Sequence, residues 1–117
     1  MLNAGDKLFV SHRRLFADDE PRFFAGRVVA YEHGLAKVAG HAFVRERIRG
    51  EFARKSDERV KIVPLGSGAV IVYQLPAAVD LAALRLESRQ HTFLLTDGSF
   101  TMNLTDRVLQ ADAPTRK

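Results

Sequence analysis

The stretch FLLTDGSFTMNL, residues 93–104, constrains the fold most, because a turn signal separates two runs in which apolar and polar residues alternate. Asp97-Gly98 suits the two-residue loop of a β-hairpin, which requires positive φ, and Gly adopts positive φ without steric cost. With that loop, Phe93 pairs with Met102 and the apolar side chains share one face of the sheet. This face consists of Phe93, Leu95, Phe100, Met102 and Leu104. The pattern predicts a hairpin, because a helix would scatter these residues around its circumference.

A second hairpin is predicted over Arg22–Val44, RFFAGRVVAYEHGLAKVAGHAFV. Its turn signal is His33-Gly34, and a loop centred there pairs Val29 with Val38. Both faces of the hairpin then carry apolar residues, which is typical of strands that curl around a small core.

Two glycines, Gly26 and Gly40, lie well inside these predicted strands. Glycine in a strand interior often marks a bulge or a sharp bend. Both positions therefore favour a tightly curved barrel over a flat sheet.

Three further strands and one helical turn are predicted from local composition. The first strand follows a turn at Gly5-Asp6 in AGDKLFV, residues 4–10, and continues toward His12, and the other two cover residues 59–65 and 69–75. Pro64 lacks an amide hydrogen, so the second of them should end there at an edge or a bulge. The third, AVIVYQL, is the most β-prone run of the chain and is predicted to be a central strand. Asp80 is expected to cap a single helical turn through Leu84, before a meander leads into the C-terminal hairpin.

The segment Arg45–Glu58, RERIRGEFARKSDE, allows two interpretations. Val44, Ile48 and Phe52 follow one another at helical spacing, which favours about three helical turns with one apolar stripe. Gly50 inside that helix would cost roughly 1 kcal/mol relative to Ala. The alternative is an irregular or β-hairpin excursion between strands.

Length and composition favour one small globular domain. The 117 residues are 46% hydrophobic and contain no cysteine, so they predict a single core without a disulfide framework or a thiolate metal site. We expect a single β-barrel domain over residues 1–110 and a polar tail over 111–117. The N-terminus lacks a signal-peptide pattern and no segment approaches the ~20 apolar residues that span a bilayer. We therefore expect a cytoplasmic protein without membrane contact.

Gly5-Asp6 is followed by an apolar strand, a loop, and the bent strand and hairpin GRVVAYEHGLAKVAG, and this order resembles that of SH3-like small barrels. The segment LLTDGSFTMNL is similar to the Asp-Gly turn segment of Sm-like proteins. The resemblance implies an architecture, namely a small barrel of antiparallel hairpins with an insertion at residues 45–58. Because such barrels serve many functions, it assigns a role to no individual residue.

No constellation of catalytic or metal-binding residues is recognisable. The four histidines are His12, His33, His41 and His91. They lack i, i+4 pairing and accompanying carboxylates at metal-ligand spacing, so we expect neither a metal nor a cofactor. Ser67, in LGSGA, is followed by a predicted strand and not by the helix of a nucleophile elbow. The acidic run at residues 18–20 precedes a proline and is expected to be a solvated loop.

The basic segment at residues 45–61 is the strongest candidate for a functional surface, with seven Arg or Lys against four Asp or Glu. The candidate phosphate contacts are Arg45, Arg47, Arg49, Arg54, Lys55 and Arg59. Phe52 lies among them and could stack on a base. The basic residues and this ring together would bind nucleic acid, and the phosphate contacts would make that binding salt-dependent. The interleaved carboxylates allow the opposite interpretation, a connector whose charges pair with one another.

From the sequence we expect an all-β domain that acts as a non-catalytic binding or assembly module. Strand-rich domains expose sheet edges, so a homo-oligomer formed through those edges is a candidate assembly. A nucleic-acid-binding barrel that uses residues 45–61 is the alternative.

Overall fold

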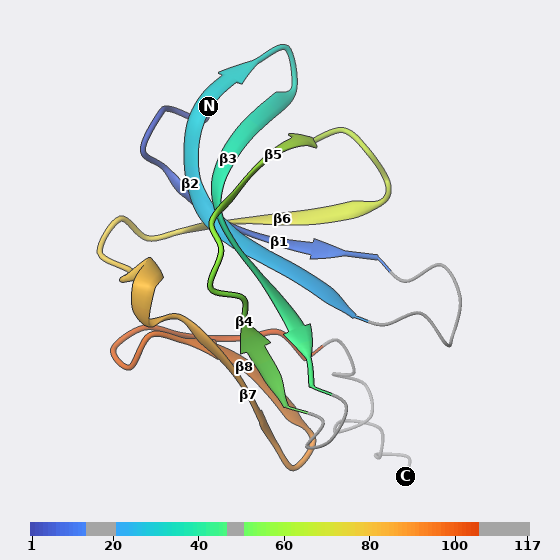
Figure 1. The fold of residues 1–117 in the computed structure, drawn as a ribbon, viewed down its shortest axis with the longest axis vertical. Helices are drawn as coiled ribbons and strands as arrows, with labels where there is room; N and C mark the ends of the chain where they lie inside the picture. The colour runs from blue at the N-terminus through green and yellow to red at the C-terminus, as the bar shows by residue number, and fades with distance from the viewer. Residues whose placement is uncertain (14–20, 47–50, 106–117) are drawn as a thin grey trace, which may run out of the picture.

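The chain is described here from a computed structural model, which covers residues 1–13, 21–46 and 51–105. Within these residues it is all-β, as predicted, and its strands form two antiparallel sheets (Figure 1). The strands are β1 (Lys7–His12), β2 (Arg22–Glu32), β3 (Leu35–Arg45), β4 (Phe52–Arg54), β5 (Arg59–Pro64), β6 (Val70–Leu75), β7 (Arg85–Arg89), β8 (Thr92–Thr96) and β9 (Thr101–Asn103). One 3-10 turn, η1 (Leu81–Ala83), precedes β7. The tail predicted at 111–117 lies outside the described residues.

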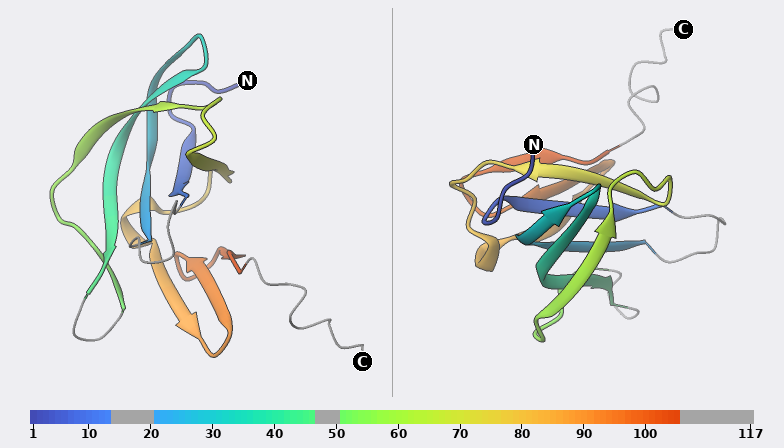
Figure 2. Two further views of the ribbon diagram at one scale, coloured as in Figure 1. Left: turned by 90° about the vertical axis from the view of Figure 1, so that its right-hand side faces the viewer. Right: turned by 90° about the horizontal axis from the view of Figure 1, so that it is seen from above.

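The larger sheet has the order β4-β3-β2-β1-β6, and β5 also pairs with β3. β3 is long enough to hold two partners on one edge, since residues 35–40 pair with β5 and residues 43–45 pair with β4. The sheet curls strongly, with the smaller sheet β7-β8-β9 packed near one end (Figure 2). Neither sheet is closed among the described strands, so the expected closed barrel is not confirmed.

The β2–β3 hairpin has the predicted turn, and next to it the predicted register, in which Tyr31 pairs with Ala36, but the register differs farther from the turn. His33 and Gly34 both have positive φ, 52° and 79°, as a loop centred on them requires. A bulge then shifts the pairing by one residue, so that Val28, and not Val29, pairs with Val38. A one-residue shift reverses the faces, and it places Val28 in the core while Val29 is exposed.

Gly26 and Gly40 pair directly with each other across β2 and β3. The bulge lies between Val28 and Ala30, so of the two predicted alternatives, a bulge or a sharp bend, the bulge is wrong for these glycines. Their role is close approach, because a Cβ built on Gly40 would lie 2.5 Å from the Cα of Gly26. The two strands can cross here only because neither residue has a side chain.

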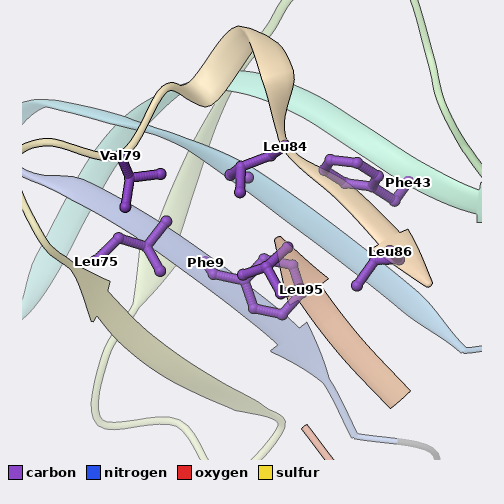
Figure 3. Close-up of a cluster of buried hydrophobic side chains, with 8 residues drawn as sticks. Phe9, Phe43, Leu75, Val79, Leu84, Leu86 and Leu95 are labelled. Atoms are coloured by element: carbon purple, nitrogen blue, oxygen red, sulfur yellow. The ribbon is translucent and has the colours of Figure 1, made fainter. Parts of the chain in front are cut away.

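The larger sheet is buried on both faces near β1, and this produces two cores. Leu8 and Val10 point into the curl, where they pack with Phe24, Val28 and other buried residues. Phe9 points the opposite way, into the core between the two sheets. Figure 3 shows this second core, in which Phe9 is surrounded by side chains from several elements. The labelled neighbours are Phe43, Leu75, Val79, Leu84, Leu86 and Leu95.

The C-terminal hairpin forms between β8 and β9, but its loop is longer than predicted. Leu95 pairs with Met102, so the loop has four residues and the register differs by two from the predicted one. A shift of two keeps paired residues such as Leu95 and Met102 on their predicted face, whereas Phe100 lies in the loop. The longer loop is stabilised by Asp97, whose Oδ1 accepts hydrogen bonds from the amides of Ser99 and Phe100.

The segment 45–58 contains a strand, so the helix interpretation is wrong and the β-hairpin excursion is confirmed. β4 pairs antiparallel with the end of β3, with Val44 opposite Ala53. The apolar stripe expected of a helix does not form, because Val44 and Phe52 belong to two paired strands. Residues 47–50 lie outside the described residues.

Three of the remaining predictions concern the end of β5, the cap of η1 and the position of β6. β5 ends at Pro64 on a sheet edge, as predicted, and the carboxylate of Asp80 caps η1 by accepting from the amide of Ala82. β6 was predicted to be central, and this is wrong, because it pairs with β1 on one side and with no described strand on the other.

In the described part of the chain, no helix has the length and apolar character needed to cross a bilayer.

Candidate functional site

A cleft of about 810 Å³ opens where the ends of β1, β2 and the β3–β4 pair meet the smaller sheet. Its lining combines aromatic rings with cationic side chains. The rings are those of Phe23, Phe52, Tyr73 and Phe93, and the cations are Arg13, Arg45 and His12 when protonated. No carboxylate occurs among the described residues that line it. A cleft of this size and composition suits a ligand with an apolar or planar body and a negative charge.

The aromatic part of the cleft is a connected cluster centred on Phe23. Its ring centroid lies 5.5 Å from that of Phe9, 5.3 Å from Phe52 and 5.6 Å from Phe93. Phe52 and Phe93 also contact each other at 5.4 Å, which closes a triangle of rings. Offset and edge-to-face pairs at these distances are favourable, so the cluster forms a preorganised aromatic floor.

Two arginines stand on different strands at the rim of the cleft. The guanidinium carbon of Arg45 lies 5.2 Å from the ring centroid of Phe52, a cation–π distance. Arg13 follows β1, and its Nη1 donates to the carbonyl of Gly68 at 3.0 Å. Both side chains are therefore held in place and keep their charge, because guanidinium is protonated at any physiological pH.

His12 connects the cleft to a second group of cations, which lies on the concave face of the larger sheet. His12 pairs with Arg22 in the β1–β2 ladder, and Lys61 on β5 lies 4.8 Å above the ring of Phe24. Burial, and then the charges of Lys61 and Arg22, hold the pKa of His12 below its ordinary value. Burial, and then Arg59 and Arg22, likewise lower the pKa of Lys61. Arg22 and Lys61 repel each other, and both oppose protonation of His12, so an anion bound here would relieve that repulsion.

The structure separates the six basic residues predicted from the sequence. Arg45 lies at the cleft, whereas Arg54 donates to the carbonyl of Leu81 at 3.1 Å. Arg59 pairs with Asp57 at 2.9 Å. The backbone of Lys55 holds it against β3: its amide donates to the carbonyl of Ala42, and its carbonyl accepts from His41 Nδ1 at 3.1 Å. Arg47 and Arg49 lie outside the described residues, so nucleic-acid binding by the six as a set stays a prediction.

The other residues considered from the sequence lie apart from the cleft. A loop centred on His33-Gly34 predicts Gly26 as the partner of His41, and the bulge in β2 shifts the pairing by one residue to Ala25. Ser67 Oγ accepts the amide hydrogen of Ala69 within the β5–β6 turn. Among the described residues no three His, Asp or Glu side chains are grouped so that they could hold a metal ion. The acidic run 18–20 lies outside the described residues.

The free edge of β6 is a second candidate for function. The amide of Arg13 donates to the carbonyl of Ala69, so Ala69 and, by alternation, residues 71, 73 and 75 direct their backbone groups at β1. Val70, Val72 and Gln74 therefore direct an N–H and a C=O away from the sheet. The strand VIVYQL contains no charge and no proline. The usual devices that protect a sheet edge from pairing are absent from it.

The lowered pKa of His12 makes folding stability depend on pH. The unfolded histidine takes up a proton near its ordinary pKa of about 6.5, whereas the folded one does so only at lower pH. The unfolded state therefore binds more protons between these two values, and stability should fall as the pH drops through that window. Denaturant unfolding of the wild type and of His12→Gln from pH 7.5 to pH 5 measures this difference, and the variant should lose less stability. Equal losses in both proteins would contradict the placement of His12 among Lys61 and Arg22.

Comparisons of the chain with protein-family models, with curated proteins and with solved structures found no match. What the protein does must therefore be inferred from its own residues, above all from the cleft and from the free edge of β6.

Proposed function

We propose that the protein is a non-catalytic binding and assembly module that pairs with a second copy of itself through β6. The observation that carries this proposal is the position of VIVYQL, the most β-prone run of the chain, at a sheet edge. A long, uncharged and apolar edge strand is a template for another strand. Sheet extension across a two-fold axis would satisfy its outward backbone groups.

The sequence of β6 is complementary to itself in the antiparallel direction. With a two-fold axis at Val72, this residue faces its own copy, and Val70 of one chain faces Gln74 of the other. Every outward N–H and C=O of the three residues then has a partner, since these positions form the hydrogen-bonded pairs of the ladder. On the opposite face Ile71, which is 46% exposed in the single chain, would lie beside the ring of Tyr73 from the other copy.

The other long edge, β5, is less suited to pairing. The amide of Leu65 donates to Gly34, so Pro64 is one of the residues whose backbone faces outward. Proline has no N–H to offer a partner strand, and Lys61 adds a charge to the same strand. Proline and lysine are the residues by which sheet edges are commonly protected.

A role in binding also agrees with the chemistry of the described side chains. No histidine among them hydrogen-bonds to a serine or threonine, which is the contact that activates a hydroxyl nucleophile. The cleft instead presents aromatic rings and fixed cations, which are typical of recognition.

Sedimentation equilibrium over a range of concentrations tests the assembly. Gln74 is exposed, and Gln74→Pro removes an outward amide hydrogen without removing a hydrogen bond inside the sheet. The wild type should form a dimer, and the variant should dissociate at concentrations at least about tenfold higher than the wild type. Circular dichroism should show that both proteins are folded to the same extent.

Ile62→Lys is the matched control, because Ile62 is 64% exposed and lies on the rival edge β5. This change should leave the dimer intact. A wild type that is monomeric throughout the concentration range would refute the proposal, and a dimer lost in Ile62→Lys but kept in Gln74→Pro would show that β5 is the interface.

A further inference from the structure

We infer that the aromatic cleft binds single-stranded nucleic acid, with a base against the Phe23, Phe52 and Phe93 rings and its phosphate between Arg45 and Arg13. This inference rests on the Phe23, Phe52 and Phe93 rings and on two arginines, and it does not depend on dimer formation. The cleft and the proposed dimer edge share only the side chains of Ile71 and Tyr73 on β6. It also replaces the basic segment 45–61, taken as a continuous patch, with residues that come from different strands.

The aromatic floor supplies the site for a base. Phe23, Phe52 and Phe93 are each half-buried, and their mutual contacts fix the rings before a ligand arrives. Every nucleobase has a planar face, so such a floor binds bases with little sequence preference. A preorganised floor loses little conformational entropy on binding, which favours affinity.

The cations supply the site for phosphate. Arg45 is anchored over Phe52 and Arg13 is anchored on Gly68, so positive charge flanks the aromatic floor on the β3 side and on the β1 side. Because no described carboxylate lines the cleft, these charges are not neutralised within it. Guanidinium groups also form paired hydrogen bonds with phosphate oxygens, which fixes the register of a bound strand.

A polynucleotide fits better than a single nucleotide because the positive charge continues beyond the cleft. His12 lines the cleft and also belongs to the group of Arg22 and Lys61 on the concave face. Successive phosphates of a strand leaving the cleft past His12, at the end of β1, would meet Arg22 and Lys61 in turn. A single nucleotide would leave their mutual repulsion in place. An uncharged peptide or lipid chain would use the aromatic floor but leave the arginines unmatched.

Fluorescence anisotropy with fluorescein-labelled oligo(dT) and oligo(rU) of about ten nucleotides tests the inference, since single-strand sites usually cover several nucleotides. The wild type should bind at low salt, and its affinity should fall steeply as salt is added. Arg45→Gln should weaken binding by about tenfold and reduce the salt slope by about one. Phe52→Leu should weaken binding while leaving the salt slope unchanged, because it removes stacking and no charge.

Arg85→Gln is the matched control, since Arg85 carries the same charge but is exposed on β7, where it pairs with Glu87 at 2.7 Å. Its affinity should stay within about twofold of the wild type. Equal losses in Arg85→Gln and Arg45→Gln would overturn the cleft as the site, because attraction would then depend on net charge alone. Absence of binding at low salt would overturn the inference entirely. Thymidine monophosphate should compete poorly, and competition as strong as that of unlabelled oligonucleotide would show that the cleft binds free nucleotides.

Discussion

Replacing Gly40 with alanine should destabilise the domain by about 3 kcal/mol or more, enough to leave much of a marginally stable protein unfolded. The new Cβ would overlap the carbonyl of Ala25 and lie 2.5 Å from the Cα of Gly26. Both obstacles are backbone atoms of the paired strand, so a change of side-chain rotamer cannot relieve the clash. The strands would have to separate, which breaks the β2–β3 ladder at its centre. Chemical denaturation followed by circular dichroism measures the loss.

Gly66→Ala is the matched control for this change. Gly66 lies in the turn after β5, and a Cβ built there has no neighbour within 4 Å. Its stability should change by no more than about 0.5 kcal/mol, as expected for an unobstructed surface position. If Gly40→Ala and Gly66→Ala had equal stability, the close crossing of β2 and β3 would be wrong.

Replacing Phe9 with alanine should cost about 3–5 kcal/mol, because this ring is one of the largest fully buried side chains in the core between the sheets. Phe9 is 0% exposed and stacks on Phe23 with ring centroids 5.5 Å apart. Removing it leaves a cavity between two sheets that are held apart by their other contacts, so the site can collapse only in part. Phe23 would also lose its support, and the aromatic floor of the cleft should become disordered.

Ile62→Ala controls for the general effect of removing an apolar side chain from a strand. Ile62 is 64% exposed on the convex side of β5, and its truncation should cost less than about 1 kcal/mol. Thermal unfolding of both variants against the wild type measures the difference. A loss for Phe9→Ala as small as that for Ile62→Ala would contradict the two-sheet core.

The C-terminal hairpin shows what could be predicted from local sequence. Period-two alternation and the Asp-Gly turn are properties of neighbouring residues, so they predicted the hairpin and its apolar face correctly. The predicted loop length was wrong because Asp97 accepts two amide hydrogen bonds within a four-residue loop, and its Oδ2 also accepts from the amide of Asp80 outside the hairpin. The local sequence pattern does not indicate a contact between residues far apart in the chain.

In the β2–β3 hairpin and in β6, tertiary packing determines the strand register and the position of the strand in the sheet. Both Val28 and Val29 suit a buried strand position, and the choice of Val28 depends on the core formed with Val10 and Val63. The composition of β6 indicated burial, and its side chains do pack on both cores. Val70 and Val72 contact the core inside the curl, and Leu75, only 3% exposed, belongs to the core between the sheets. Side-chain burial does not report whether the backbone has one partner strand or two, so a central position was the wrong conclusion.

The cleft was only partly foreseen for the same reason. Arg45 and Phe52 were both selected from the basic segment, and they do contact each other. The rest of the aromatic floor comes from strands far apart in the sequence, and it assembles only when the smaller sheet packs on the larger one. The sequence alone gave no reason to bring Phe23 and Phe93 together.

The position of β1 between β2 and β6 has a consequence for how the chain folds. β1 begins at Lys7, yet its second partner strand ends at Leu75 and its neighbour Leu95 in the inter-sheet core follows later still. The long chain segment between β1 and these partners must lose conformational entropy before the stabilising contacts form. Folding should therefore be slow for a domain of this size. On the ribosome, the first strand to emerge would be among the last to complete its contacts, and Leu8, Phe9 and Val10 would stay exposed until then.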